Sequence, residues 1–163
     1  MKGLLFVCVS MAGLILATTG IHAQVSHSAT ITVSNIAVVS VSSGVVSLSI
    51  TGAGVVAGVN AMTVTDQSTT LSWGANTSTA KIAVKTNLVT QKYTLQVQAI
   101  NINGVPSSSG ITAPAVTLST TSTDFMTGIG LKRGTCNLLY TGTALASKGT
   151  GSDSHTITFT ITN

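Results

Sequence analysis

The residues that could do chemistry in this sequence are few and far apart. After residue 23 the chain has one cysteine, Cys136, two histidines, His27 and His155, and three aspartates, and the whole sequence has no glutamate. A catalytic cysteine needs a nearby histidine that lowers its pKa, and these histidines lie near opposite ends of that stretch. Two histidines without a thiolate or carboxylate beside them make a weak metal site. We therefore expect no catalytic residues, no metal site and no enzyme.

A glycine-spaced stretch is the only feature that resembles a cofactor loop. It reads Gly128-Ile129-Gly130-Leu131-Lys132-Arg133-Gly134. A phosphate-binding loop of this kind leads from a strand into a helix, whose N-terminus holds the phosphate. Another strand pattern follows here, so the stretch predicts a turn and no bound cofactor. Serine and threonine are plentiful, but none lies in the Gly-x-Ser-x-Gly elbow of a hydrolase.

Parity along the strands predicts which of the remaining candidates are buried. Cys136 alternates in step with Leu138 and Tyr140, which indicates a core thiol that behaves as a small hydrophobe. A glycan-binding surface would need exposed aromatic rings. Trp73, Tyr93 and Tyr140 all share parity with apolar neighbours, so the sequence favours burial of these rings.

The charges are few and scattered. After residue 23 there are six basic residues and three acidic ones, a mildly positive balance. Nucleic-acid binding requires clustered basic residues with aromatic residues between them. Neither feature is present, so we expect no nucleic-acid partner.

The sequence predicts that strands carry these residues. Period-2 alternation of apolar and polar residues recurs along the chain, and Gly-, Asn- and Ser-rich turns separate the runs. This pattern predicts an all-β fold, an antiparallel Ig-like or Greek-key β-sandwich of about seven to ten strands. The expected strands cover residues 29–33, 46–50, 80–85, 93–99, 116–118, 136–140 and 157–161.

The first residues have the pattern of a cleaved signal peptide. Lys2 precedes an apolar run from Leu4 to Leu16, and Ala23 is a small residue suited to the position before the cut. The run is shorter than the ~20 apolar residues that a membrane span needs. We expect a signal peptide over 1–23, one β-sandwich domain over 24–163 without a transmembrane segment, and export from the cell.

Four stretches also carry a resemblance to a family. They are residues 27–33, 93–99, 137–141 and 155–162, each with strict alternation. Together they resemble an uncharacterised family of exported bacterial β-sandwich domains that is loosely similar to fimbrial and other surface-filament subunits. The resemblance implies a structural role at the surface of a Gram-negative bacterium or in its periplasm, and it carries over no functional residues.

Strands near the two ends are candidates for pairing between molecules. Their inward-facing residues are Ala29, Ile31, Val33, Ile157, Phe159 and Ile161. The first strand can complete its own sheet or add to the exposed edge of a neighbour. The same alternation serves both arrangements, but the next run follows directly at Ile36, which favours an internal strand.

The function expected from the sequence is structural. We expect a cell-surface or extracellular protein, a fimbrial or filament subunit that self-associates or joins other surface proteins through strand pairing. The alternative is a non-catalytic adhesin or carbohydrate-binding module with a glycan as its partner.

Overall fold

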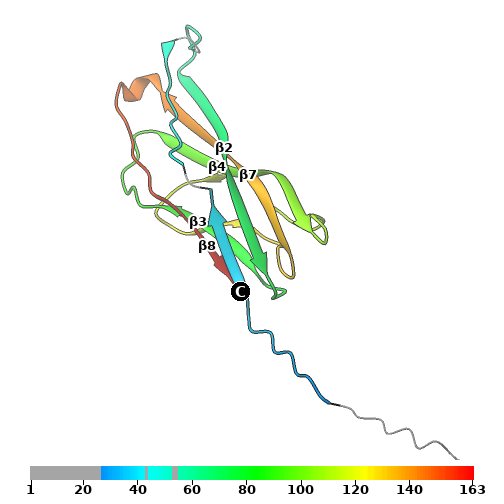
Figure 1. Cartoon of the computed structure of the whole chain (residues 1–163). Coiled ribbons are helices and arrows are strands. Elements are labelled where there is room, and N and C mark those ends of the chain that lie inside the picture. The colour runs from blue at the N-terminus through cyan, green and yellow to red at the C-terminus, as the bar shows by residue number, and fades with distance from the viewer. Residues whose placement is uncertain (1–26, 43, 53–54) are drawn as a thin grey trace, which may run out of the picture. The chain divides into compact units, whose positions relative to one another are not determined.

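The computed structural model describes residues 27–42, 44–52 and 55–163, and these residues form an all-β structure (Figure 1). Val33–Asn163 is one compact unit, and residues up to Thr32 belong to a separate unit in which residues 27–32 contain neither helix nor strand. The expected signal peptide lies outside the described residues. None of the described residues belongs to a helix long and apolar enough to cross a membrane.

The strands form two antiparallel sheets, and one short 3-10 helix, η2, precedes the last strand. The elements are β1 (Ala37–Val41), β2 (Ala61–Ala75), β3 (Lys81–Thr86), β4 (Thr94–Val105), β5 (Val116–Thr117), β6 (Thr123–Met126), β7 (Arg133–Leu145), η2 (Ala146–Lys148) and β8 (Ile157–Thr162).

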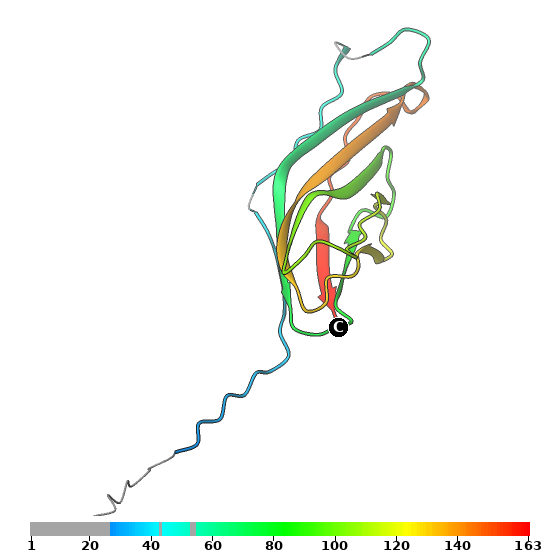
Figure 2. The same ribbon diagram turned by 90° about the vertical axis from the view of Figure 1, so that its right-hand side faces the viewer.

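The larger sheet has five strands in the order β1-β2-β7-β4-β5. Its long central strands, β2 and β7, pair from Ala61↔Leu145 to Gly74↔Arg133, and the sheet curls strongly along their length (Figure 2). The register shifts between Asp66 and Thr69, where the Asp66 carboxylate accepts hydrogen bonds from the Ser68 amide at 3.0 Å and the Ser68 hydroxyl at 2.7 Å. Such a bulge increases the local twist.

The smaller sheet has three strands in the order β6-β3-β8. The pairs Ile82↔Ile161 and Val84↔Phe159 join β3 to β8. Among the described residues β8 forms a ladder with β3 alone, and its second edge contacts β1 without pairing with it.

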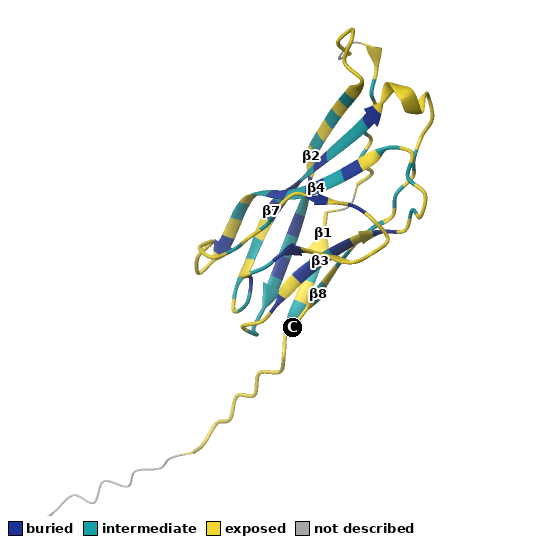
Figure 3. Cartoon of the chain, turned by 180° about the vertical axis from the view of Figure 1, so that it is seen from behind, coloured by how far each residue is buried: buried dark blue, intermediate teal, exposed yellow. Residues whose placement is uncertain are grey.

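One apolar core lies between the sheets. Along β3, β4 and β7, more buried residues alternate with less buried ones, as Figure 3 shows by colour, and the buried row faces the core. Phe125 of β6 and Phe159 of β8 meet edge to face, with ring centroids 5.2 Å apart. The buried cluster consists of Leu71, Trp73, Ala80, Ile82, Val84, Leu95, Val97, Ala99, Val116, Leu118, Phe125, Met126, Ile129, Cys136, Leu138 and Tyr140.

The structure confirms most of the predicted strands and corrects others. The expectations for 80–85, 93–99, 116–118, 136–140 and 157–161 correspond to β3, β4, β5, β7 and β8. The runs at 29–33 and 46–50 alternate but belong to no strand, because neither forms a ladder with another segment of the described chain. Whether residues 29–33 pair as an internal strand or as a donor strand therefore stays a prediction. The sequence analysis did not predict β1, β2 or β6.

Candidate interaction groove

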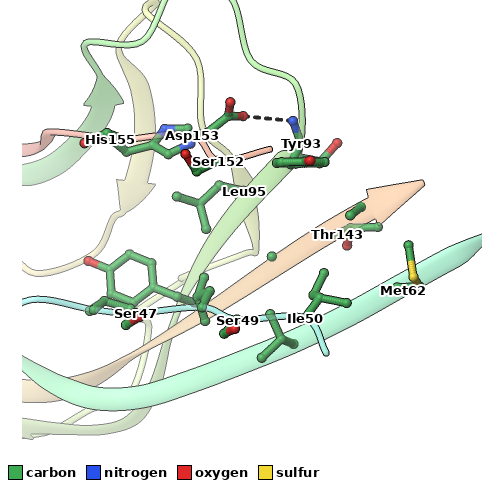
Figure 4. Close-up of a pocket in the computed structure, with 18 of the residues that line it drawn as sticks. Ser47, Ser49, Ile50, Met62, Tyr93, Leu95, Thr143, Ser152, Asp153 and His155 are labelled. Carbon is green, nitrogen blue, oxygen red and sulfur yellow. Dashed lines mark hydrogen bonds between the residues drawn. The ribbon is translucent and has the colours of Figure 1, made fainter. Parts of the chain in front are cut away.

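A groove of about 1080 Å³ runs along one side of the fold. The residues that follow β1 form one wall, and the residues that lead into β8 form the other. Strands β2, β4 and β7 supply the floor, which includes Met62, Val64, Leu95, Tyr140 and Gly142. Figure 4 shows Ser47, Ser49 and Ile50 on one side of the groove and Ser152, Asp153 and His155 on the other.

The first wall is the post-β1 segment, residues 44–51. It alternates like a strand: Val46, Leu48 and Ile50 are half-buried, whereas Val45 is 95% exposed. Its backbone makes no hydrogen bond with any other described residue. The wall is thus held by its side chains, and its backbone donors and acceptors have no partner among the described residues.

The second wall is the pre-β8 segment, residues 149–156. It is tied to the start of β4 through Asp153, whose carboxylate accepts hydrogen bonds from the backbone amides of Lys92 and Tyr93, both at 2.8 Å. The Lys92 ammonium also donates to the Thr150 carbonyl at 2.5 Å. Among the described residues the backbone amides of 150–155 have no hydrogen-bond acceptor. This wall is therefore anchored through Asp153 and through backbone groups of Gly149, Thr150 and Thr156, and its unpaired backbone amides lie between these anchors.

One titratable side chain in this wall has a shifted pKa. His155 is half-buried, and its Nδ1 lies 3.1 Å from the Thr86 hydroxyl oxygen, within hydrogen-bond distance. Burial lowers the pKa of His155, and the nearby Asp153 carboxylate opposes that shift in part. The neutral ring is therefore favoured in the folded state.

The floor between the walls combines apolar side chains with Thr69, Thr94 and Thr143, and it is not fully covered. Leu48 lies over Gly142 of β7, so that a Cβ placed on this glycine would meet the Leu48 side chain at 3.3 Å. Ile157 and Phe159 line the opposite side and are half-buried. The volume lies at the upper end of the ~300–1,000 Å³ of ordinary small-molecule sites. Unpaired backbone groups on both walls, above a floor with apolar side chains, match what an added β-strand requires.

The structure divides the predicted pairing residues into two groups. Ile157, Phe159 and Ile161 lie in β8 and face β3 residues across the ladder, and the first two also line the groove. Ala29, Ile31 and Val33 lie outside every strand and join no ladder in the described chain. The sequence analysis missed the groove itself. Alternation at 46–50 was a signal of its first wall, but alternation does not tell whether a strand has a partner.

The other candidate residues lie away from the groove or are enclosed in the core. Cys136 is buried, as its parity predicted, and burial raises the pKa of its thiol to about 11 against the opposing effect of a backbone hydrogen bond with Leu71. Gly130 and Leu131 form a turn that leads into β7, as predicted for the glycine-spaced stretch. No group of three His, Cys, Asp or Glu residues suited to a metal ion occurs within residues 27–42, 44–52 and 55–163.

The aromatic side chains are covered to different degrees. Trp73 and Tyr140 are buried, which confirms the prediction from their parity. Tyr93 is half-buried, and its hydroxyl donates a hydrogen bond to the Gly149 carbonyl at 2.8 Å. None of the five aromatic residues in the described chain is fully exposed.

Comparison with known proteins adds no relative. No protein-family model matches the chain, no curated protein matches it, and no solved structure matches it.

Proposed function

We propose that this protein is an exported, non-catalytic structural subunit of the cell surface or extracellular space, which assembles through β-strand addition at the groove. The observation that carries the proposal is the second edge of β8, which contacts β1 but pairs with no strand among the described residues. An unpaired strand edge is a ready template for pairing with another chain.

The strand order supports this proposal. An immunoglobulin constant-type sandwich has strands A-B-E-D in one sheet and C-F-G in the other. If β1, β2, β3, β4, β7 and β8 are taken as A to F, the observed orders β1-β2-β7-β4 and β3-β8 agree with A-B-E-D and C-F. The position of strand G, beside β8, then has no strand among the described residues. We propose that the fold is Ig-like and that its last strand comes from a partner.

The alternative of a glycan-binding module has weaker support. Sugars stack on exposed aromatic faces, whereas Trp73 and Tyr140 are buried and Tyr93 is held against Gly149 by its hydroxyl. The groove is walled by backbone and by small side chains. These features favour a peptide strand as the ligand.

Electron microscopy of the purified exported protein over a range of concentrations tests the proposal. We expect filaments or linear oligomers whose length grows with concentration. Monodisperse particles at every concentration, confirmed by light scattering, would contradict a self-assembling subunit. Binding of the same particles to a glycan array would then support the adhesin alternative.

A further inference from the structure

We propose, as a step that depends on the proposed function, that residues 27–33 of a second copy of this chain fill the groove as an added strand. Such a strand would lie between the post-β1 segment and the pre-β8 segment. It would turn Ala29, Ile31 and Val33 toward the floor. Each copy would thereby supply the strand that the next copy lacks.

The walls define what the occupant must be. Both present backbone groups without partners among the described residues, and apolar side chains such as Met62, Val64 and Leu95 line the floor between them. A ligand that satisfies both walls needs backbone donors and acceptors along its two sides. It also needs apolar side chains at every second position, because successive strand residues face opposite ways. An extended peptide has this pattern, and a small molecule or a helix does not.

Residues 27–33 meet these requirements. Ala29, Ile31 and Val33 alternate with Ser28, Thr30 and Thr32, and the segment contains no Asp, Glu, Lys or Arg. Val33 is 68% exposed, so its apolar side chain lacks the cover that burial would give it. Seven residues span roughly 23 Å as a strand, close to the length of the eight-residue post-β1 segment. Pattern and length therefore fit the groove.

The residues that lead into β1 indicate that the donor belongs to another copy. The Asn76 side chain donates to the Ser34 carbonyl and accepts from the Ile36 amide, both at 2.7 Å. The Asn76 amide donates to the Ile36 carbonyl at 3.1 Å. These bonds hold residues 34–36 in line with β1, and residues 33–36 contain no turn. A segment that filled its own groove would need a reversal at this point. Donation to the next copy needs none, and repeated donation gives an open chain of subunits.

Pairs of single cysteine variants test which segments meet. One protein carries Thr30→Cys in the donor, and a second carries Ser154→Cys or Thr158→Cys beside the groove. These two acceptor positions are exposed and have the opposite parity to Asp153 and Ile157. When the two proteins are mixed and mildly oxidised, we expect a disulfide between different molecules, identified by mass spectrometry of the linked peptides. The matched control is Thr117→Cys, an exposed position on β5, an edge strand of the larger sheet.

A pair of charge substitutions tests whether the apolar face of the donor enters the groove. Ile31→Asp places a carboxylate on the inward face, and Thr30→Asp places the same charge one residue away on the outward face. A carboxylate is costly to bury without a partner, so we expect Ile31→Asp to weaken self-association by about tenfold or more. Thr30→Asp should assemble as the unmodified protein does.

The outcomes separate this inference from the proposed function. If the unmodified protein assembles while Ile31→Asp has no effect and no Thr30–Ser154 or Thr30–Thr158 link forms, the donor assignment is wrong and the structural role stands. If a doubly substituted chain forms the link only within itself, the occupant is its own segment, and donation between copies is overturned. If the unmodified protein never assembles, the proposed function fails.

Discussion

Burial changes the chemistry of two side chains that project from β7 into the core. Cys136 and Tyr140 lie on the inward face of this strand and are nearly inaccessible to water. Burial raises the pKa of the Cys136 thiol to about 11 and that of the Tyr140 hydroxyl to about 12, the latter helped by the negative charge of Asp66. Both groups therefore remain protonated at neutral pH, and neither is set up as a nucleophile or base.

We predict that the Cys136 thiol is unreactive in the native protein. The thiolate is the reactive form, and it is scarce when the pKa is raised in an apolar site. A thiol reagent such as Ellman's should label the protein only after it unfolds. Replacement by Ser should lower the free energy of unfolding by about 1–3 kcal/mol, because the hydroxyl would be buried with poor hydrogen bonding. Rapid labelling of the native protein, or a dimer lost on reduction, would contradict the prediction.

Because the pKa of His155 is lowered in the folded state, we predict that the protein loses stability in mildly acid solution. The His155 pKa is lower in the folded state than in the unfolded chain, so the unfolded chain binds the proton more readily. The free energy of unfolding should fall as the pH drops below the ordinary histidine pKa of about 6.5. We expect the His155→Gln variant to lose less stability than the unmodified protein between about pH 7.5 and pH 5, where the carboxylates remain ionised. Denaturant titrations at both pH values measure this difference, and equal losses in the two proteins would refute it.

At the scale of the elements, the sequence predicted most strands that have apolar residues in strict alternation. The regular runs in β3, β4, β7 and β8 were predicted because each has apolar residues at every second position. β2 was missed because its first half is rich in Thr, Ser and Gln, and because the bulge between Asp66 and Thr69 breaks the period. β6 has only four residues, too few to show a period.

The groove could not be predicted from the sequence. Alternation of apolar and polar residues is a property of a single strand, whereas pairing depends on a second strand beside it. The runs at 29–33 and 46–50 have the same pattern as the paired strands. Whether such a run joins a ladder depends on which backbone lies beside it in the fold. That information is spread over the chain, in the topology that places β8 at the edge of its sheet.

A close approach of three strands at Gly134 gives a prediction for β7. Gly134 pairs with Trp73 of β2 on one side and with Gly104 of β4 on the other. A Cβ at this position would meet the Asn103 carbonyl oxygen and the Trp73 ring. We expect Gly134→Ala to lower the free energy of unfolding by about 1–3 kcal/mol through overpacking.

Gly44→Ala is the matched control for that substitution. A Cβ on Gly44 meets no atom within 4 Å, so we expect a change of less than about 0.5 kcal/mol, typical of an unconstrained surface position. Chemical denaturation of both variants measures the difference. Equal stability of the Gly134 and Gly44 variants would show that β2, β4 and β7 adjust to the added methyl group.

At the scale of the whole molecule, the proposed role begins with export. The positively charged start, the apolar run and Ala23 predict that cells release a chain that begins at Gln24. N-terminal sequencing or the intact mass of the exported protein measures the cleavage site. Recovery of a product that retains residues 1–23 would contradict the prediction. Cleavage after Ala23 would leave residues 27–33 close to the new N-terminus, where a strand is easily donated.

A synthetic peptide with the sequence of the donor segment tests strand donation directly. It should compete with assembly only if the subunits are joined through that segment. A peptide of residues 27–36 added in excess should occupy the groove of the full protein and compete with the donor segment of the next copy. Assembly should then stop at short oligomers. A ligand that binds only the folded state also stabilises it, by about 2.7 kcal/mol at a free concentration one hundred times its Kd. Thermal denaturation should show the corresponding rise in Tm.

The control peptide carries Asp in place of Ile31 and is otherwise identical. It keeps the backbone groups and the length but places a charge where the groove floor is apolar. We expect it to leave both the oligomer distribution and Tm unchanged. If both peptides act equally, backbone pairing without the apolar row explains binding, and the assignment of Ala29, Ile31 and Val33 to the floor is wrong. If neither acts at saturating concentration, the groove does not accept this segment.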